Sequence, residues 1–242
     1  HGVSALHAAV GRVSTWLAEW YRERGMRATA VSGGGRLGLD PNRRLPLVKA
    51  LLARGADPNA RITRSTVVLG YLARPRRGAF EQNSVGTGDV RGATPLWVAA
   101  YAAGASRAGG DTTLEIMRVL LTAGASLHLT TDDGTTPLMA AAGLGSQIGA
   151  RAPSAIEAVK ILVEAGADVR AVNEAEFTAL HGAAWREQAD SIVEFLVARG
   201  AELDVKNNRG WTPLVIAEGI HTGGNFIKSD TTTALLRSLG AA

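Results

Sequence analysis

The stretch TALHGAAWREQADSIVEFLVARGAELDVKNNRGW, residues 178–211, decides the fold of this 242-residue chain. It opens on Thr178, a residue type that caps the N-terminus of a helix, and continues into small apolar residues. A second apolar run follows at helical spacing over 192–197, and Gly200 is placed to end that helix in the left-handed conformation. The turn-forming run 207–210 then predicts a tight hairpin. These residues therefore predict the order helix, helix, hairpin.

The same two motifs recur along the chain in a constant order. The threonine or serine that opens the first motif occurs at Ser4, Thr94, Thr136, Thr178 and Thr212. The glycine of the second motif occurs at Gly55, Gly124, Gly166, Gly200 and Gly240. Only residues 178–211 show the pair without insertions, and a fixed order repeated five times indicates an internal repeat.

Helix, helix and hairpin at this period resemble the ankyrin repeat, and its signatures T-P-L-H-x-A-A and G-A-D-x-N-A stand almost intact. The resemblance is to the bacterial type with long inter-helix insertions. It implies one all-α domain over 1–242, a solenoid of five helix–helix repeats joined by β-hairpin loops. The repeats fall at about 2–61, 91–130, 133–171, 174–206 and 208–241, with insertions at 13–44 and 62–90. Such insertions either form a working surface or are tolerated because loop closure costs little.

Two positions of the motif vary between the copies. The motif histidine is kept at His7 and His181 and is replaced by Trp97, Met139 and Val215. These replacements predict the loss of a hydrogen bond between hairpin and helix. The asparagine that follows the second glycine is kept at Asn59 and is replaced by His128, Arg170 and Asp204, which predicts weaker individual repeats.

Large rings cluster at the junction of the last two repeats. Phe177 and Trp211 occupy matching hairpin positions, and Trp185 follows from the helix between them. Exposed aromatic rings beside arginine are typical of a protein-binding hot spot, although the same rings could instead pack against neighbouring repeats or the 221–228 segment. The candidate protein-binding residues are Tyr101, Asp132, Asp133, Phe177, Trp185, Arg186, Asn208, Arg209 and Trp211.

The resemblance implies a non-catalytic scaffold that binds a protein through the concave face and the hairpin tips. Two alternatives stay open. One is a structural solenoid in which copies stack end to end. The other is an anionic partner drawn to the basic front, since residues 1–91 carry 15 Lys and Arg against 6 Asp and Glu. Nucleic acid is disfavoured, because no known binding motif or interleaved aromatic residues accompany the charge.

The residues give little support to an enzyme or to a bound cofactor or metal. Residues 33–38 match G-x-G-x-x-G but are followed by Asp40-Pro41 rather than by a helix in a βαβ unit. The five histidines are scattered, and the chain has no cysteine. No apolar run reaches the roughly 18 residues of a membrane span. Residue usage favours a bacterial source and leaves the compartment open, either cytoplasmic or exported with a signal already removed.

Overall fold

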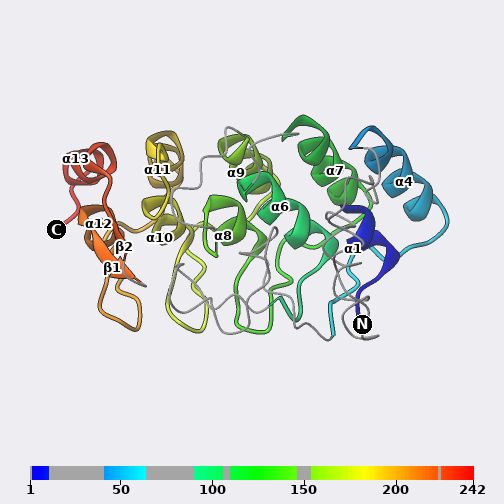
Figure 1. Ribbon diagram of the computed structural model, residues 1–242, viewed down its shortest axis with the longest axis horizontal. Helices are drawn as coiled ribbons and strands as arrows, with labels where there is room; N and C mark the ends of the chain where they lie inside the picture. Colours follow the sequence, from blue (N-terminus) through cyan, green and yellow to red (C-terminus); the bar gives the residue numbers. More distant parts are fainter. Residues whose placement is uncertain (1, 11–40, 64–89, 106–109, 146–153, 223–224) are drawn as a thin grey trace.

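The computed structural model describes residues 2–10, 41–63, 90–105, 110–145, 154–222 and 225–242. Within these ranges, ten helices pack as five pairs of one inner and one outer helix. The inner helices are α1 (Ala5–Val10), α6 (Pro95–Ala105), α8 (Pro137–Ala142), α10 (Ala179–Ala184) and α12 (Pro213–Glu218). Their outer partners are, in the same order, α4 (Pro41–Ala53), α7 (Gly110–Thr122), α9 (Ala155–Glu164), α11 (Asp190–Ala198) and α13 (Asp230–Ser238). The pairs stand in one row (Figure 1), which confirms the predicted all-α solenoid.

The predicted insertions fall mostly outside the described residues. Residues 41–44 were assigned to the first insertion, but they form the first turn of α4. Of the second insertion only 62–63 and 90 are described, and the glycine-rich run 33–38 is not among the described residues.

Threonine starts the inner helices, as the motif predicts. The Thr136 hydroxyl accepts a hydrogen bond from the Met139 amide, and Pro137 occupies the first turn, where its missing N–H costs nothing. Thr178 and Thr212 cap α10 and α12 in the same way. Each such cap stabilises its helix by about 1 kcal/mol.

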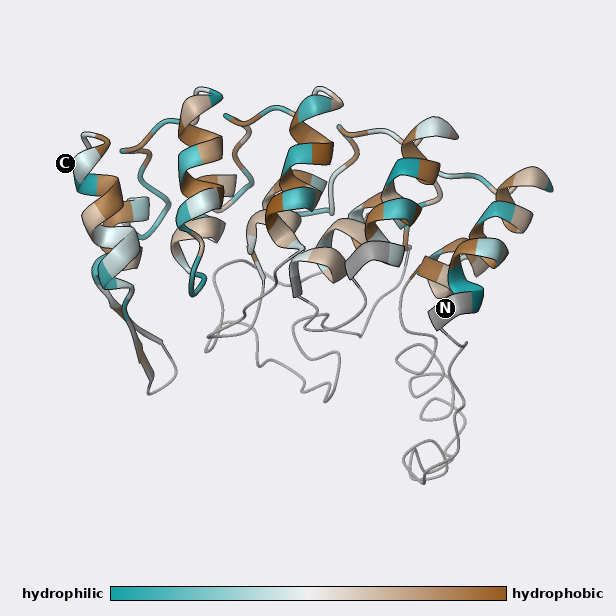
Figure 2. Ribbon diagram, turned by 90° about the horizontal axis from the view of Figure 1, so that it is seen from above, coloured by the Kyte–Doolittle hydropathy of each residue, from teal (hydrophilic) through white to brown (hydrophobic). Residues whose placement is uncertain are grey.

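Small residues let the inner helices stack closely on one another. A Cβ atom at Gly104 would lie 2.7 Å from the Ala141 carbonyl oxygen, and one at Gly182 would lie 2.6 Å from the Leu144 nitrogen. Every residue of α8 and of α10 is buried. The outer helices are amphipathic instead, with alternating apolar and polar stripes (Figure 2). The core is therefore one continuous apolar layer between the two rows of helices.

Glycine ends the outer helices by its backbone conformation rather than by its size. Gly200 has φ of +90°, and the amide after it donates to the Leu196 carbonyl at 3.0 Å. Among the described residues, only the Arg170 side chain comes within 4 Å of a Cβ atom placed there. The left-handed conformation itself therefore selects glycine.

Side chains between hairpin and outer helix tie neighbouring repeats together. Asn59 Nδ2 donates to the Gly124 carbonyl (2.9 Å), and its Oδ1 accepts from the Ser126 amide (2.7 Å). Arg170 Nε makes an equivalent bond to the glycine carbonyl of the next repeat (3.0 Å), and Asp204 Oδ1 accepts from the amide of the C-terminal residue (3.0 Å). The weakening predicted for these two replacements is thus offset by a new bond.

A short two-stranded ladder joins α12 to α13 and was not predicted. Strands β1 (Ile220–Thr222) and β2 (Asn225–Ile227) pair antiparallel, with His221 opposite Phe226. The Phe226 ring lies so close to Gly219 that a Cβ there would approach its Cζ to 2.3 Å. The φ of +123° is what requires glycine at 219, since the exposed Phe226 ring has room to turn away from a Cβ atom.

Candidate protein-binding surface at the hairpin tips

Three hairpins close in the same way, with an amide before the turn donating to a carbonyl after it. These pairs are Thr131 with Thr135 (3.1 Å), Asn173 with Phe177 (3.1 Å) and Asn207 with Trp211 (3.0 Å). The residues enclosed by these three bonds are the tips 132–134, 174–176 and 208–210. Residues 91–92 form the corresponding tip of the first hairpin. We call these four segments the tip row.

Backbone hydrogen bonds join each tip to the next. The Asp132 amide donates to the Arg91 carbonyl (2.7 Å), and the Glu174 amide donates to the Asp133 carbonyl (2.9 Å). A third bond runs from the Asn208 amide to the Ala175 carbonyl (3.2 Å). The tip row is therefore one hydrogen-bonded surface rather than a set of independent loops.

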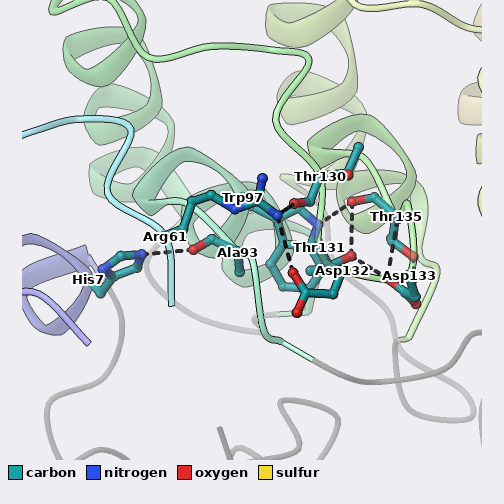
Figure 3. A network of polar contacts seen from close by, with 9 residues as sticks. All are labelled: His7, Arg61, Ala93, Trp97, Thr130, Thr131, Asp132, Asp133 and Thr135. Atoms are coloured by element: carbon teal, nitrogen blue, oxygen red, sulfur yellow. Dashed lines mark hydrogen bonds and ion pairs between the residues drawn. The ribbon is translucent and has the colours of Figure 1, made fainter. Parts of the chain in front are cut away.

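A side chain at the base of each turn holds its shape. Asp133 is buried and accepts hydrogen bonds from the Thr131 hydroxyl and from the amide and hydroxyl of Thr135 (Figure 3). Asn207 Oδ1 accepts from the amides of Arg209 (2.9 Å) and Trp211 (3.0 Å). Asp133 was predicted to bind a partner, whereas its buried carboxylate is bonded within the turn and shapes the tip from inside.

Ring nitrogens on the inner helices bond to backbone carbonyls of the hairpins and so hold the hairpins against the helices. His7 Nε2 bonds to the Ala93 carbonyl and His181 Nε2 to the Trp211 carbonyl, both at 3.0 Å. The indole Nε1 of Trp97 donates to the Thr135 carbonyl at the same distance (Figure 3). The prediction that replacing the motif histidine loses this bond is therefore wrong at Trp97, because an indole also carries an N–H at that reach.

Both motif histidines are held in the neutral form. Burial lowers the pKa of His181 to about 4, against hydrogen bonds to the backbone that act to raise it. Burial also lowers the pKa of His7. Each Nδ1 lies within hydrogen-bonding distance of the amide and hydroxyl that cap its own helix, Ser4 or Thr178. Among the described residues, no group of three or more His, Asp or Glu side chains is placed to hold a metal ion.

Four further predicted contact residues are buried, so the expected patch of exposed rings is wrong. The exposed fractions are 3% for Tyr101, 5% for Phe177, 1% for Trp185 and 2% for Arg186. Tyr101 stacks on Trp97 with ring centroids 5.6 Å apart, and Phe177 meets the His181 ring edge-on at 5.5 Å. These rings form part of the core.

Arg186 crosses three repeats inside the core. Its Nη2 donates to the Gly104 carbonyl in the last turn of α6. Its side chain passes over Gly143, where a Cβ would lie 2.6 Å from the arginine Cδ. Burial lowers the pKa of Arg186 to about 10, so the group stays charged at neutral pH, and the negative end of α6 offsets part of that charge. Nη1 has no hydrogen-bond partner among the described residues, and burial raises the pKa of the nearby Tyr101.

The remaining predicted residues lie at the surface of the tip row. Asp132, Asn208 and Arg209 are exposed, and Trp211 is half-buried. Asp132 pairs with Arg61 at 3.2 Å, with both side chains about half exposed, so the pair adds little stability. Glu174 and Glu176 are also exposed there and were missed. Glu174 is in register with Asp132 and Asn208, and Glu176 lies two residues further along the same tip, so the register of the hairpins is the signal that identifies both.

A stack of repeats with an exposed, hydrogen-bonded tip row defines a repeat solenoid of the protein-binding class. Two overlapping matches to a family model described as ankyrin repeats (3 copies) cover residues 103–207 and 147–225, together just over half of the chain. The chain belongs to the ankyrin repeat family. No curated protein gives a significant match. No helix in the described ranges is long and apolar enough to cross a membrane.

Proposed function

We propose that this chain is a non-catalytic scaffold that binds a protein partner on the tip row. Ankyrin repeats generally mediate protein–protein interaction. The observation that carries the proposal is the run of hydrogen bonds from tip to tip. A surface held in this way loses little conformational entropy on binding, which favours affinity.

The exposed side chains differ from one tip to the next. They change from Asp132 to Glu174 and Glu176, and then to Asn208 and Arg209. A fixed backbone with varied side chains is the arrangement that gives a binding surface its specificity. By contrast, α8 and α10 present no exposed residue, so they offer a partner little direct contact.

Glu176 supports a functional role for the central tip. Its φ is +62°, in the left-handed region, while the matching positions of the neighbouring tips are Gly134 and Gly210. A side chain in this conformation costs about 1 to 2 kcal/mol. Strained residues of this kind cluster at binding sites, so the charged side chain at this tip supports its use in recognition.

Site-specific photo-crosslinking tests the proposal. A photoreactive amino acid is placed at Asn208 on the last tip and, as a matched control, at Glu115, an exposed position of outer helix α7. In extract of the native source, the Asn208 probe should crosslink one discrete protein, and the Glu115 probe should not. The captured protein is then purified, and its affinity is measured for wild type and for Asn208→Ala.

Two outcomes contradict the proposal. One is crosslinking from Glu115 with none from Asn208, which would place the partner on the outer helices. The other is an unchanged affinity when the tip side chains 132, 174 and 208 are all replaced by alanine. Sedimentation of the purified chain tests the alternative in which copies stack end to end. Stacking predicts that the particle mass increases with protein concentration, whereas a binding module should keep the mass of a monomer.

A further inference from the structure

Trp211 differs from the residues at matching positions of the other hairpins. Ala93, Thr135 and Phe177 are each buried, whereas the Trp211 ring is only half-buried. The Arg209 guanidinium lies over this ring, with its Cζ 5.1 Å from the ring centroid. In the part of the chain that the structure describes, no carboxylate pairs with Arg209.

This tip is also held rigidly. Asn207 Oδ1 fixes the amides of Arg209 and Trp211, and the Gly210 amide donates to the Asn207 carbonyl at 2.8 Å. His181 holds the Trp211 carbonyl from the helix side. The stacked pair is thus preorganised, and a ligand does not have to order it.

We propose that Arg209 and Trp211 together receive a carboxylate side chain of the protein partner. The planar guanidinium presents a fork of N–H donors that matches the two oxygens of a carboxylate. The exposed part of the indole packs against the methylene groups that carry it. This assignment rests on the proposed function and names the chemistry of one contact.

The neighbouring tip restricts the partner further. Glu174 and Glu176 are exposed on the tip that is bonded to this one through Asn208 and Ala175. They repel an extended polyanion and favour a partner with a basic residue beside its carboxylate. A protein segment of mixed charge fits this surface, and a nucleic acid strand does not.

Nuclear magnetic resonance on the whole chain tests the assignment with a pair of blocked hexapeptides. One peptide contains a glutamate and a lysine, and the other has glutamine in place of the glutamate. The glutamate peptide should shift the Trp211 indole N–H signal and the Arg209 amide signal. The glutamine peptide should bind at least about tenfold more weakly, as expected when a charged hydrogen-bonding partner is removed.

Matched arginine variants locate the effect. Arg209→Gln should abolish the preference for glutamate, and Arg209→Lys should retain only part of it, because an ammonium lacks the fork. Arg199→Gln is the control, since Arg199 also lies over a ring, that of Phe195 at 4.6 Å, but at the end of α11. This control should leave binding unchanged.

Equal shifts from both peptides, or an unchanged preference in Arg209→Gln, would overturn the assignment. A dodecamer of thymidylate that shifts the same signals more strongly than the glutamate peptide would overturn it in favour of a nucleic acid. If the assignment fails while Asn208 still crosslinks a protein, the proposed scaffold function stands without it.

Discussion

Acidification should weaken the link between α10 and the last hairpin, because that link depends on a neutral histidine. His181 is fully buried, and burial lowers its pKa from 6.5 to about 4. Between these values the unfolded chain binds a proton that the folded chain does not. The stability that His181 contributes is therefore complete above about pH 6.5 and is lost as the pH falls toward 4.

The size of the effect follows from the pKa shift. One pKa unit corresponds to about 1.4 kcal/mol, so the full shift corresponds to about 3 kcal/mol once the pH is below 4. At about pH 5 the loss is about 2 kcal/mol, since about 1.5 units of the shift have then been traversed. A change of that size is a large part of the stability of a typical domain.

Urea unfolding followed by circular dichroism measures this loss in wild type and in His181→Gln. Glutamine can still donate to the Trp211 carbonyl but cannot titrate in this range. The carboxylates are common to both proteins, so their titration cancels in the difference. The advantage of wild type should shrink by about 2 kcal/mol between about pH 7.5 and about pH 5. A difference that stays constant with pH would refute the neutral, buried state of His181.

Three substitutions test the packing and the turns, each by urea unfolding at neutral pH. Trp97→Phe keeps a ring but removes the donor to the Thr135 carbonyl, and should lower the free energy of unfolding by about 1 kcal/mol; no loss would mean that the indole bond is unimportant. Glu176→Gly should raise it by about 1 kcal/mol by relieving the left-handed backbone, and a decrease would contradict that strain. Leu180→Ala should lower it by about 2 to 5 kcal/mol, whereas a loss below 1 kcal/mol would show that this leucine is not core.

Local signals in the sequence were sufficient for the fold. A threonine cap such as Thr178 and a terminating glycine such as Gly200 act within a few residues of themselves, so the helix ends can be identified without tertiary information. The period then orders the pairs along the solenoid. The ladder between α12 and α13 was missed because its strands are only three residues long and carry no repeat signal.

The candidate site was only partly predictable, because exposure depends on geometry beyond one helix. Trp185 was placed on an open face by continuing an ideal helix through it. Its backbone is indeed still helical (φ −75°, ψ −17°), but the ring is buried in the core, and helical periodicity does not show which other elements cover it. At Trp97 the prediction failed for another reason. Replacing the motif histidine by tryptophan was predicted to remove the bond to the hairpin, but the indole N–H makes that bond instead.

The crossing of Arg186 over Gly143 has a consequence for how such a chain can change its length. A stack in which each repeat touches only its neighbours can gain or lose a unit by clean duplication or excision. Here the side chain of Arg186, just after the end of α10, bonds to the Gly104 carbonyl of α6, two repeats away, and passes over Gly143 between them. Excision of the intervening repeat would bring the guanidinium to the wrong carbonyl and leave a buried charge unsatisfied. The three central repeats are therefore coupled through Arg186, and we expect the chain to tolerate the loss of a unit better at the ends of the row than at its middle.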